Sequence, residues 1–161
     1  MKKLIITGFI GFIFAFVVSC GEGNTNSGTK VPAGEGSTKT ENENPSYDPK
    51  RGEGKFTNVE VGVGIDAAMA TNGEKVFGVK CQGCHKLTDE KLVGPGWKGV
   101  TSRHTPEWIM NFITNTDEML SKDPKAQAQL EICLVRMPNQ NLADEDARAL
   151  YEFMRKNDGV K

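Results

Sequence analysis

Residues 77–87, FGVKCQGCHKL, bring together two cysteines and a histidine as Cys81, Cys84 and His85. The C-x-x-C-H spacing puts one helical turn between the thiols. That would let both thiols meet the vinyl groups of one porphyrin while the imidazole binds its iron. The same residue types also occur in zinc sites and in redox-active dithiols. The remainder of the chain has to distinguish between these chemistries.

The two alternatives to haem find little support elsewhere in the sequence. A structural zinc site normally needs four ligands in two pairs, but Cys133 stands alone and His104 is the only other histidine. A thioredoxin-like dithiol needs a βαβ setting, whereas the pattern of this chain is helical. One covalently attached haem c per chain is therefore the favoured cofactor.

Length and composition limit the classes of protein further. With 161 residues the chain has room for one ordinary domain. Its formal net charge of −1 gives no reason to expect nucleic-acid binding. Four cysteines in a chain of this length do not make a disulfide scaffold.

The N-terminus has the pattern of an export signal. Lys2 and Lys3 precede an apolar run at 4–18, and its roughly 15 residues are fewer than the roughly 20 that a membrane span needs. The run leads into Val-Ser-Cys, which resembles a bacterial lipobox. We therefore expect residues 1–19 to be a lipoprotein signal peptide and Cys20 to carry a lipid. An ordinary secretory signal or an uncleaved anchor would also export the chain.

Two segments separate this signal from the rest of the chain. Residues 20–55 are rich in Gly, Ser, Thr, Asn, Glu and Pro. Such a segment cannot bury enough apolar surface to offset the entropy lost on ordering, so we expect a disordered tether. Its typical span would be about 30–35 Å. Residues 56–65 alternate valines with Glu60 and Gly62 and are expected to form an extended arm that lies on the domain.

Residues 66–157 have helical patterns and are expected to form one all-α domain. Capping side chains, prolines at the first helical position and a run of three acids mark the helix starts. The expected helices follow Asp66, Thr105 and Asp123, and a last one covers 144–156. The helix after Asp123 should run to about residue 135, and residues 86–104 should form a loop.

This region resembles a mono-haem class I cytochrome c. The family pattern G-x-x-x-F-x-x-x-C-x-x-C-H is present as Gly73, Phe77, Cys81, Cys84 and His85. The resemblance implies the class I cytochrome c fold, with the haem in the core and the first and last helices crossing at the small glycine. Leu150 and Phe153 stand where the partners of that glycine belong.

The resemblance also implies roles for residues around the haem. Pro95, which follows Gly94, would offer its carbonyl to the ring N–H of His85. Trp97 and Trp108 would line the haem, either through indole donors that meet a propionate or through ordinary core packing.

Met137 is the expected sixth ligand, so that His85 and Met137 would hold the iron between them. It lies in a loop just before the last helix, where the thioether is free to reach the metal. Its rivals are Met119 and His104, the latter otherwise expected at the surface or at the propionate edge. Cys133 is expected to be a small buried hydrophobe.

Lysines cluster around the haem motif. They form either a solvated face or a positive rim that steers an acidic partner to the haem edge. The set consists of Lys80, Lys86, Lys91 and Lys98.

Together these features predict an electron carrier attached by a lipid to the periplasmic side of a bacterial membrane. It would carry single electrons from a quinol-oxidising complex to a terminal reductase or oxidase, with no catalytic residue, small-molecule substrate or nucleic acid. The stretches CHKLTDEKLVGPGWKGV and RMPNQNLADE are similar to lipoprotein cytochromes found with nitrous-oxide reductases. The alternatives are a haem enzyme or gas sensor with a labile sixth ligand, and a haem module docked in a larger respiratory complex.

Overall fold

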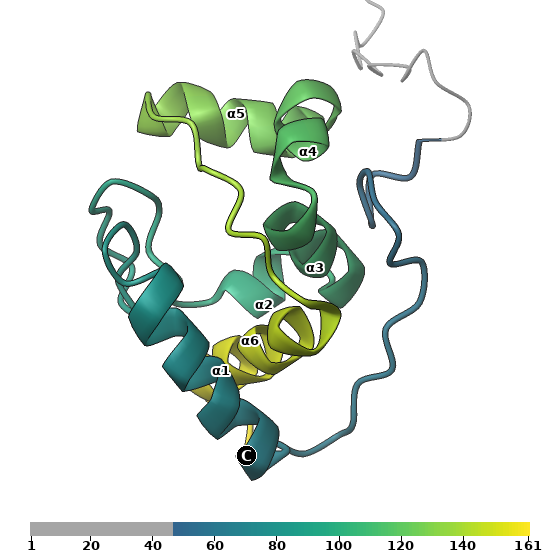
Figure 1. Cartoon of the computed structure of the whole chain (residues 1–161), viewed down its shortest axis with the longest axis vertical. Coiled ribbons are helices and arrows are strands. Elements are labelled where there is room, and N and C mark those ends of the chain that lie inside the picture. Colours follow the sequence, from purple (N-terminus) through teal and green to yellow (C-terminus); the bar gives the residue numbers. More distant parts are fainter. Residues whose placement is uncertain (1–46) are drawn as a thin grey trace, which may run out of the picture. The chain divides into compact units, whose positions relative to one another are not determined.

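The structure is a computed structural model that describes residues 47–161. These residues are helical and contain no strand (Figure 1). The proposed signal peptide at 1–19, Cys20 and the tether as far as residue 46 lie outside the described residues. The helices are α1 (Ala67–Lys80), α2 (Val100–Arg103), α3 (Pro106–Thr114), α4 (Thr116–Lys122), α5 (Pro124–Cys133) and α6 (Asp144–Asn157).

The starts of three helices follow from local capping. The side chains of Asp66, Thr105 and Asp123 each accept a hydrogen bond, at 2.8–3.2 Å, from the backbone N–H three residues later. These bonds satisfy backbone donors that have no partner within the helix. The N-cap of α6, Ala143, makes no such bond, and this helix begins with three acidic residues at its positive end instead.

Two helices and one helix end differ from the sequence-based expectation. The four-residue α2 interrupts the loop expected at 86–104, and α4 lies between the expected helices. Helix α5 ends at Cys133, because Leu134 adopts a left-handed conformation with φ 60°. The Leu134 N–H closes the last turn by donating to the Leu130 carbonyl. Short helices of one or two turns leave too little periodicity for a sequence pattern to identify.

Helices α1 and α6 cross at Gly73 (Figure 1). A Cβ at this position would lie 2.0 Å from the Ala149 carbonyl oxygen and 2.8 Å from the Phe153 Cβ. The two backbones are therefore in direct contact, which only glycine permits. Phe153 is a partner of Gly73, as expected, whereas Ala149 rather than Leu150 makes the closest approach. Leu150 is fully buried in the core.

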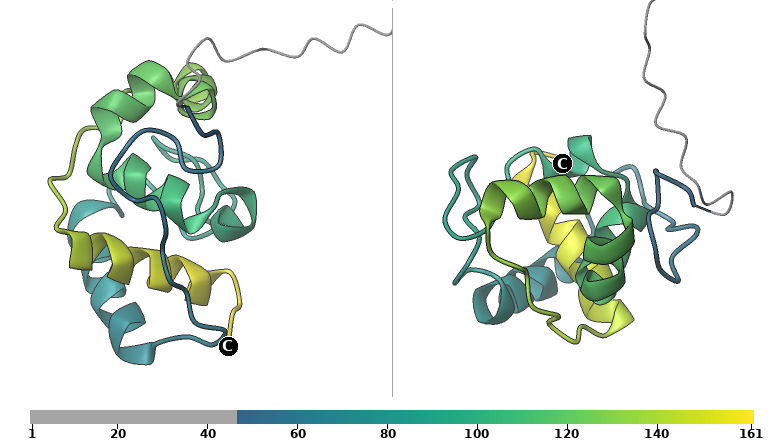
Figure 2. Two further views of the ribbon diagram at one scale, coloured as in Figure 1. Left: turned by 90° about the vertical axis from the view of Figure 1, so that its right-hand side faces the viewer. Right: turned by 90° about the horizontal axis from the view of Figure 1, so that it is seen from above.

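Residues 47–56 form a strap that lies over α3, α4 and α5 (Figure 2). The Tyr47 hydroxyl donates to Asp123 at 2.5 Å. Asn111 accepts from the Phe56 N–H and donates to the Arg51 carbonyl, both at 2.9 Å. Residues 47–55, which the sequence assigned to the tether, are therefore attached to the helical domain. The polar composition of this segment is matched by buried polar partners on the helices, which a composition argument does not detect.

Residues 57–65 continue as irregular chain towards α1. Val59 and Val61 pack against the core, while Val63 is fully exposed. The Arg155 guanidinium donates to the carbonyls of Gly62 and Gly64 at 2.7 and 3.2 Å. Among the helices of residues 47–161, none is both long and apolar enough to cross a membrane.

Candidate cofactor site

A cavity of about 240 Å³ opens between the loop after α1, helices α3 and α5, and the chain after α5. A neighbouring cavity of about 80 Å³ shares six of its lining residues, among them His85 and Met137, and extends to the exposed Cys84. The walls are mainly apolar. The apolar lining of the larger cavity includes Trp97, Val100, Trp108, Ile109, Phe112, Ile113, Ile132, Met137 and Met154.

His85 is oriented by a hydrogen bond to the backbone. Its Nδ1 lies 2.9 Å from the Pro95 carbonyl oxygen. Because a carbonyl can only accept, Nδ1 carries the proton and Nε2 keeps a free lone pair. Burial lowers the pKa of His85, partly opposed by the bond to Pro95, which favours the neutral imidazole that binds metals. A Cβ on Gly94 would lie 2.3 Å from the His85 ring, so the glycine makes room for it.

The two cysteines of the motif lie at the end of α1 and differ in environment. Cys81 is 5% exposed, and burial raises the pKa of its thiol to about 11. Cys84 is exposed and lines the smaller cavity. The N–H groups of Cys84 and His85 both donate to the Cys81 carbonyl at 3.0 Å. This turn places the histidine directly beside the cysteines at the cavity.

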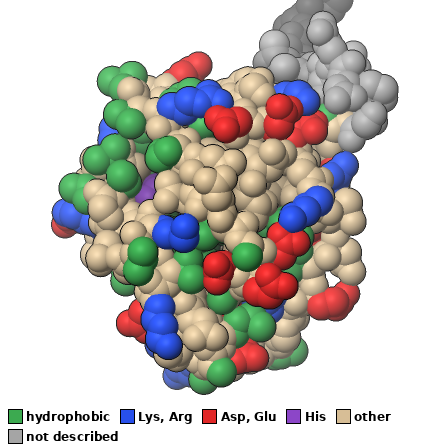
Figure 3. Space-filling view, viewed as in Figure 1, with side chains coloured by type: hydrophobic (Ala, Val, Ile, Leu, Met, Phe, Trp, Pro, Cys, Tyr) green, Lys and Arg blue, Asp and Glu red, His purple; other side chains and the backbone are tan. Residues whose placement is uncertain are grey.

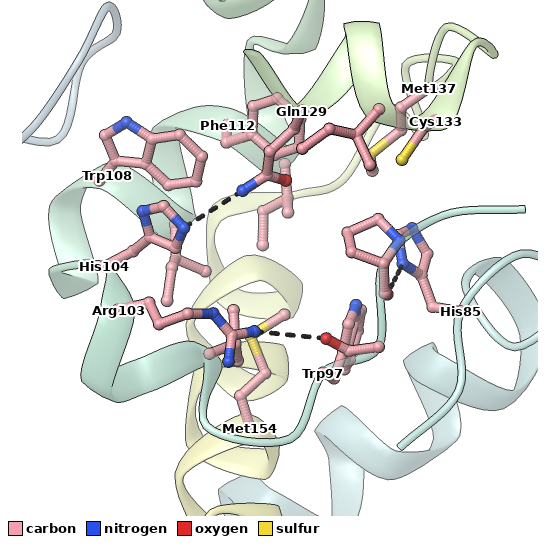
Figure 4. Close-up of a pocket in the computed structure, with 16 residues that line it drawn as sticks. His85, Trp97, Arg103, His104, Trp108, Phe112, Gln129, Cys133, Met137 and Met154 are labelled. Carbon is pink, nitrogen blue, oxygen red and sulfur yellow. Dashed lines mark hydrogen bonds between the residues drawn. The ribbon is translucent and has the colours of Figure 1, made fainter. Parts of the chain in front are cut away.

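Met137 lies in the loop before α6 and lines both cavities together with His85. Figure 4 shows Met137 and Cys133 on the α5 side of the larger cavity, with His85 across from them. Met119, the expected methionine rival, is fully buried under the strap, where its sulfur accepts from the Glu53 N–H at 3.0 Å. It lines neither cavity. Cys133 is half-buried in the wall.

Both tryptophans line the larger cavity (Figure 4). The Trp97 ring lies 5.6 Å from the His85 ring. The Trp108 indole N–H donates at 3.0 Å to Asp123, whose carboxylate is fully buried. Trp108 therefore contributes its ring to the wall, and its donor is already used within the protein.

His104 also forms part of the cavity wall. It stacks on Trp108 with ring centroids 3.9 Å apart, and its Nε2 lies 3.4 Å from the Gln129 amide nitrogen. Burial, with Lys125 and Arg103 nearby, lowers the pKa of His104 to about 4, so the ring is neutral at physiological pH. Its Nδ1 is the one buried side-chain polar atom of the described residues without a partner. His104 is therefore half-buried in the cavity wall and is not a freely solvated surface residue.

Sequence reasoning missed several other lining residues, among them Phe112 and Gln129. Phe112 follows Trp108 by one helical turn on α3, so that spacing could have indicated it. Gln129 is a polar residue on a weakly amphipathic helix, and no sequence signal distinguishes it from a solvated glutamine.

The residues at the cavity fit a covalently bound haem. The Cys84 thiol, a neutral imidazole with a free Nε2 and the Met137 thioether line one apolar space, and the Cys81 thiol is buried at the end of α1. Among residues 47–161 no cluster of three or more His, Cys, Asp or Glu side chains could hold a metal ion, which counts against the zinc alternative. The fold and the site thus define an all-α protein that binds haem through a C-x-x-C-H motif.

Comparison with known proteins gives the family. Residues 70–158, more than half of the chain, match the family described as cytochrome c. The chain belongs to the cytochrome c family, and its cofactor is haem c.

Solved structures agree with this assignment. A cytochrome c from Rhodothermus marinus is 35% identical, with a TM-score of 0.63, and the match covers 65% of this chain and 90% of that chain. An engineered cytochrome c from the same organism is 34% identical over the same shares, also with a TM-score of 0.63. A structure of that engineered protein bound to a carbene intermediate is 34% identical, again over 65% and 90%, with a TM-score of 0.60. No curated protein sequence matches the chain significantly.

Proposed function

We propose that the protein is a single-electron carrier in which Cys81 and Cys84 form the thioether bonds to haem c. His85, through Nε2, and Met137, through its sulfur, are the two iron ligands. The observation that carries this proposal is that both side chains line the same apolar space. When bound, the haem supplies the one-electron chemistry.

The residues of the chain suit a carrier better than an enzyme. Two protein ligands leave no open position for a substrate. The Pro95 carbonyl fixes the orientation and tautomer of His85. The apolar walls exclude water and disfavour the extra positive charge of the oxidised state, which raises the reduction potential.

The physiological setting is part of the proposal. The signal-like residues 1–19 and the lipobox-like context of Cys20 support export and lipid attachment on the periplasmic side of a bacterial membrane. The donor would be a quinol-oxidising complex, and the acceptor a nitrous-oxide reductase or another terminal reductase or oxidase. Mass spectrometry of the mature N-terminus would detect a diacylglyceryl group on Cys20. An unmodified or differently cleaved N-terminus would refute the anchor.

A haem enzyme or gas sensor is the second candidate, and one observation favours it. The imidazole of His104 lies in the cavity wall with an unpartnered Nδ1, and Met137 sits on a loop rather than a helix. If Met137 were labile, His104 would be available to a ligand in the cavity.

The visible spectrum distinguishes the two candidates. We expect oxidised wild type to show a weak far-red sulfur-to-iron band that disappears in Met137→Ala and persists in the control Met154→Leu. A high-spin or bis-histidine spectrum in wild type would contradict the carrier assignment and favour the second candidate. Purified nitrous-oxide reductase and a terminal oxidase, each supplied with the reduced holoprotein, would then identify the acceptor by the rate of oxidation.

A further inference from the structure

Two oxidisable side chains share one buried carboxylate between the cofactor cavity and the strap. The Trp108 indole N–H donates to Asp123 Oδ2 at 3.0 Å, and the Tyr47 hydroxyl donates to the same oxygen at 2.5 Å. Asp123 is fully buried. Trp108 lines the larger cavity, whereas Tyr47 is half-buried at the start of the strap. The three side chains therefore form a continuous hydrogen-bonded path from the cavity wall to the strap.

This arrangement suits oxidation coupled to proton transfer. Loss of an electron makes the N–H of an indole or the O–H of a phenol strongly acidic, so oxidation is easier when a proton acceptor is already in place. Asp123 can accept from both side chains. Burial, together with the bond to Asp123, raises the pKa of Tyr47 above its ordinary value, so the phenol keeps its proton until it is oxidised.

The other tyrosine of the chain has a less favourable environment. The chain contains two tyrosines, and Tyr151 is 5% exposed on α6. The Arg148 guanidinium lies 5.7 Å from the centre of its ring, and a neighbouring cation opposes the loss of an electron. Tyr47 is therefore the tyrosine on which an unpaired electron should settle.

Tyr47 is also separated from the cofactor site. It lines none of the cavities described above. Figure 3 shows acidic and basic side chains interspersed over the strap and α4. A radical on Tyr47 would therefore lie beside a polar surface, where a soluble reductant can quench it.

The cavity wall itself contains side chains that an oxidant would damage. The Met137 thioether and the Cys133 thiol both line the larger cavity, and peroxide oxidises such groups to a sulfoxide and a sulfenic acid. Hydrogen peroxide accepts two electrons, whereas a reduced one-electron carrier supplies one. The second electron has to come from the protein. If the oxidation fell on Met137, the proposed iron ligand would be lost.

We propose that Trp108, Asp123 and Tyr47 form an electron relay that supplies this second electron and so protects the cavity from peroxide. Trp108 gives up an electron, and its indole proton passes to Asp123. Tyr47 then gives an electron to Trp108, which regains its proton from Asp123, and the phenolic proton passes through Asp123 to solvent.

The reaction balances as a whole. Hydrogen peroxide, the reduced protein with Tyr47 intact and one proton from solvent give two waters and the oxidised protein with a radical on Tyr47. The proposal requires the haem c of the family assignment. It goes beyond the carrier function and does not depend on which residue is the sixth ligand.

The test treats the reduced holoprotein, full-length in a Cys20→Ala background, with hydrogen peroxide. Electron paramagnetic resonance of rapidly frozen samples detects the radical, and ring-deuterated tyrosine identifies it as tyrosyl by narrowing the signal. Mass spectrometry follows the formation of Met137 sulfoxide.

Two variants interrupt the relay and two serve as controls. Tyr47→Phe removes the phenol, and Trp108→Phe keeps an aromatic ring in the wall but removes the indole N–H. Tyr151→Phe is the control for the other tyrosine. Lys125→Met is the control for the strap, because it also removes one hydrogen bond to the strap, that of Lys125 to the Pro49 carbonyl at 2.8 Å, and leaves the relay intact.

We expect a tyrosyl signal in wild type and in both controls. In Tyr47→Phe and Trp108→Phe this signal should be lost, and Met137 sulfoxide should form several-fold faster. Absence of the signal from wild type, its persistence in Tyr47→Phe, or Met137 oxidation as fast in Lys125→Met as in Tyr47→Phe would overturn the relay. The spectrum before peroxide is added tests the carrier function separately, because a wild type without the sulfur-to-iron band refutes Met137 ligation whether or not the radical forms.

Discussion

Helices α1 and α6 meet in direct backbone contact, with Gly73 against the Ala149 carbonyl, whereas α5 and the chain after it face the rest of the domain across a cavity. The 14 residues of α6 include eight buried ones, and the 10 residues of α5 include only Ala126. In the α1–α6 half, side chains of the protein fill the interior. The α5 half borders the cofactor cavity, so its packing is complete only with the cofactor bound.

This difference separates two sources of stability. The α1–α6 half depends on close packing and on the ion pairs that the buried Glu152 makes with Arg148 and Arg155, so substitutions there act on the protein alone. The α5 half is fastened to the domain by Asp123 and the strap on one side and faces the haem on the other. Its order should therefore depend on the cofactor.

Removing the cofactor should have the largest effect, and it should destabilise the α5 half more than the α1–α6 half. In Cys81→Ser/Cys84→Ser no thioether can form, and we expect amide protection against hydrogen exchange to disappear from α5 and from residues 134–143. Protection in α1 and α6 should fall less, because their contact does not involve the cavity. Hydrogen exchange followed by mass spectrometry measures both halves at once. Equal loss in α1, α5 and α6 would mean that the two halves are not separable.

Gly73→Val should have the next largest effect. Its branched side chain would meet the backbone of α6, which cannot move without separating the two helices. We expect a loss of at least about 3 kcal/mol in the free energy of unfolding, at or beyond the usual range for overpacking. Denaturant titration of the holoprotein measures it. Gly78→Ala, on the same helix and with open space around it, should instead stabilise the protein by up to about 1 kcal/mol.

Asp123→Ala should weaken the attachment of the strap and of α5. The substitution removes the acceptor for Tyr47, for the buried indole N–H of Trp108 and for the first turn of α5. We expect a loss of about 2–4 kcal/mol in unfolding free energy, since a buried unsatisfied donor costs about 1–3 kcal/mol and a lost cap about 1 kcal/mol. Proteolysis at residues 47–56 should become faster. The exposed Asp89→Ala is the control, and equal stability of the two variants would show that the strap is not fastened through Asp123.

Glu152→Gln should have the smallest effect, and it should depend on pH. Burial tends to raise the pKa of Glu152, but hydrogen bonds from Arg148, the Asp66 N–H and Arg155 outweigh burial and hold the pKa below its ordinary value. A lowered pKa means that the ionised form stabilises the fold above the unfolded-state pKa of about 4.3, and that this contribution is lost as the pH falls through the folded-state pKa.

The wild type should therefore exceed Glu152→Gln in stability at neutral pH, and the gap should narrow below about pH 4. Urea titrations across this range measure the gap. A constant difference from pH 7 to 3 would contradict the lowered pKa.

By itself the sequence determined the features that rest on neighbouring residues. The C-x-x-C-H spacing specified covalent haem, and Asp66, Thr105 and Asp123 specified three helix starts, because attachment chemistry and capping act within one or two turns. Gly73 predicted the helix crossing through its place in the family pattern.

Only the tertiary structure decided the features that join distant segments. Tyr47 and Asp123 are 76 residues apart, yet their bond turns part of an expected tether into a strap. Burial under that strap takes Met119 away from the cavity, while stacking on Trp108 brings His104 into its wall. Lys91 donates to the Ile132 carbonyl, 41 residues away, and so joins the loop after α1 to the end of α5. Long-range burial and pairing depend on where the whole chain passes, which no local pattern encodes.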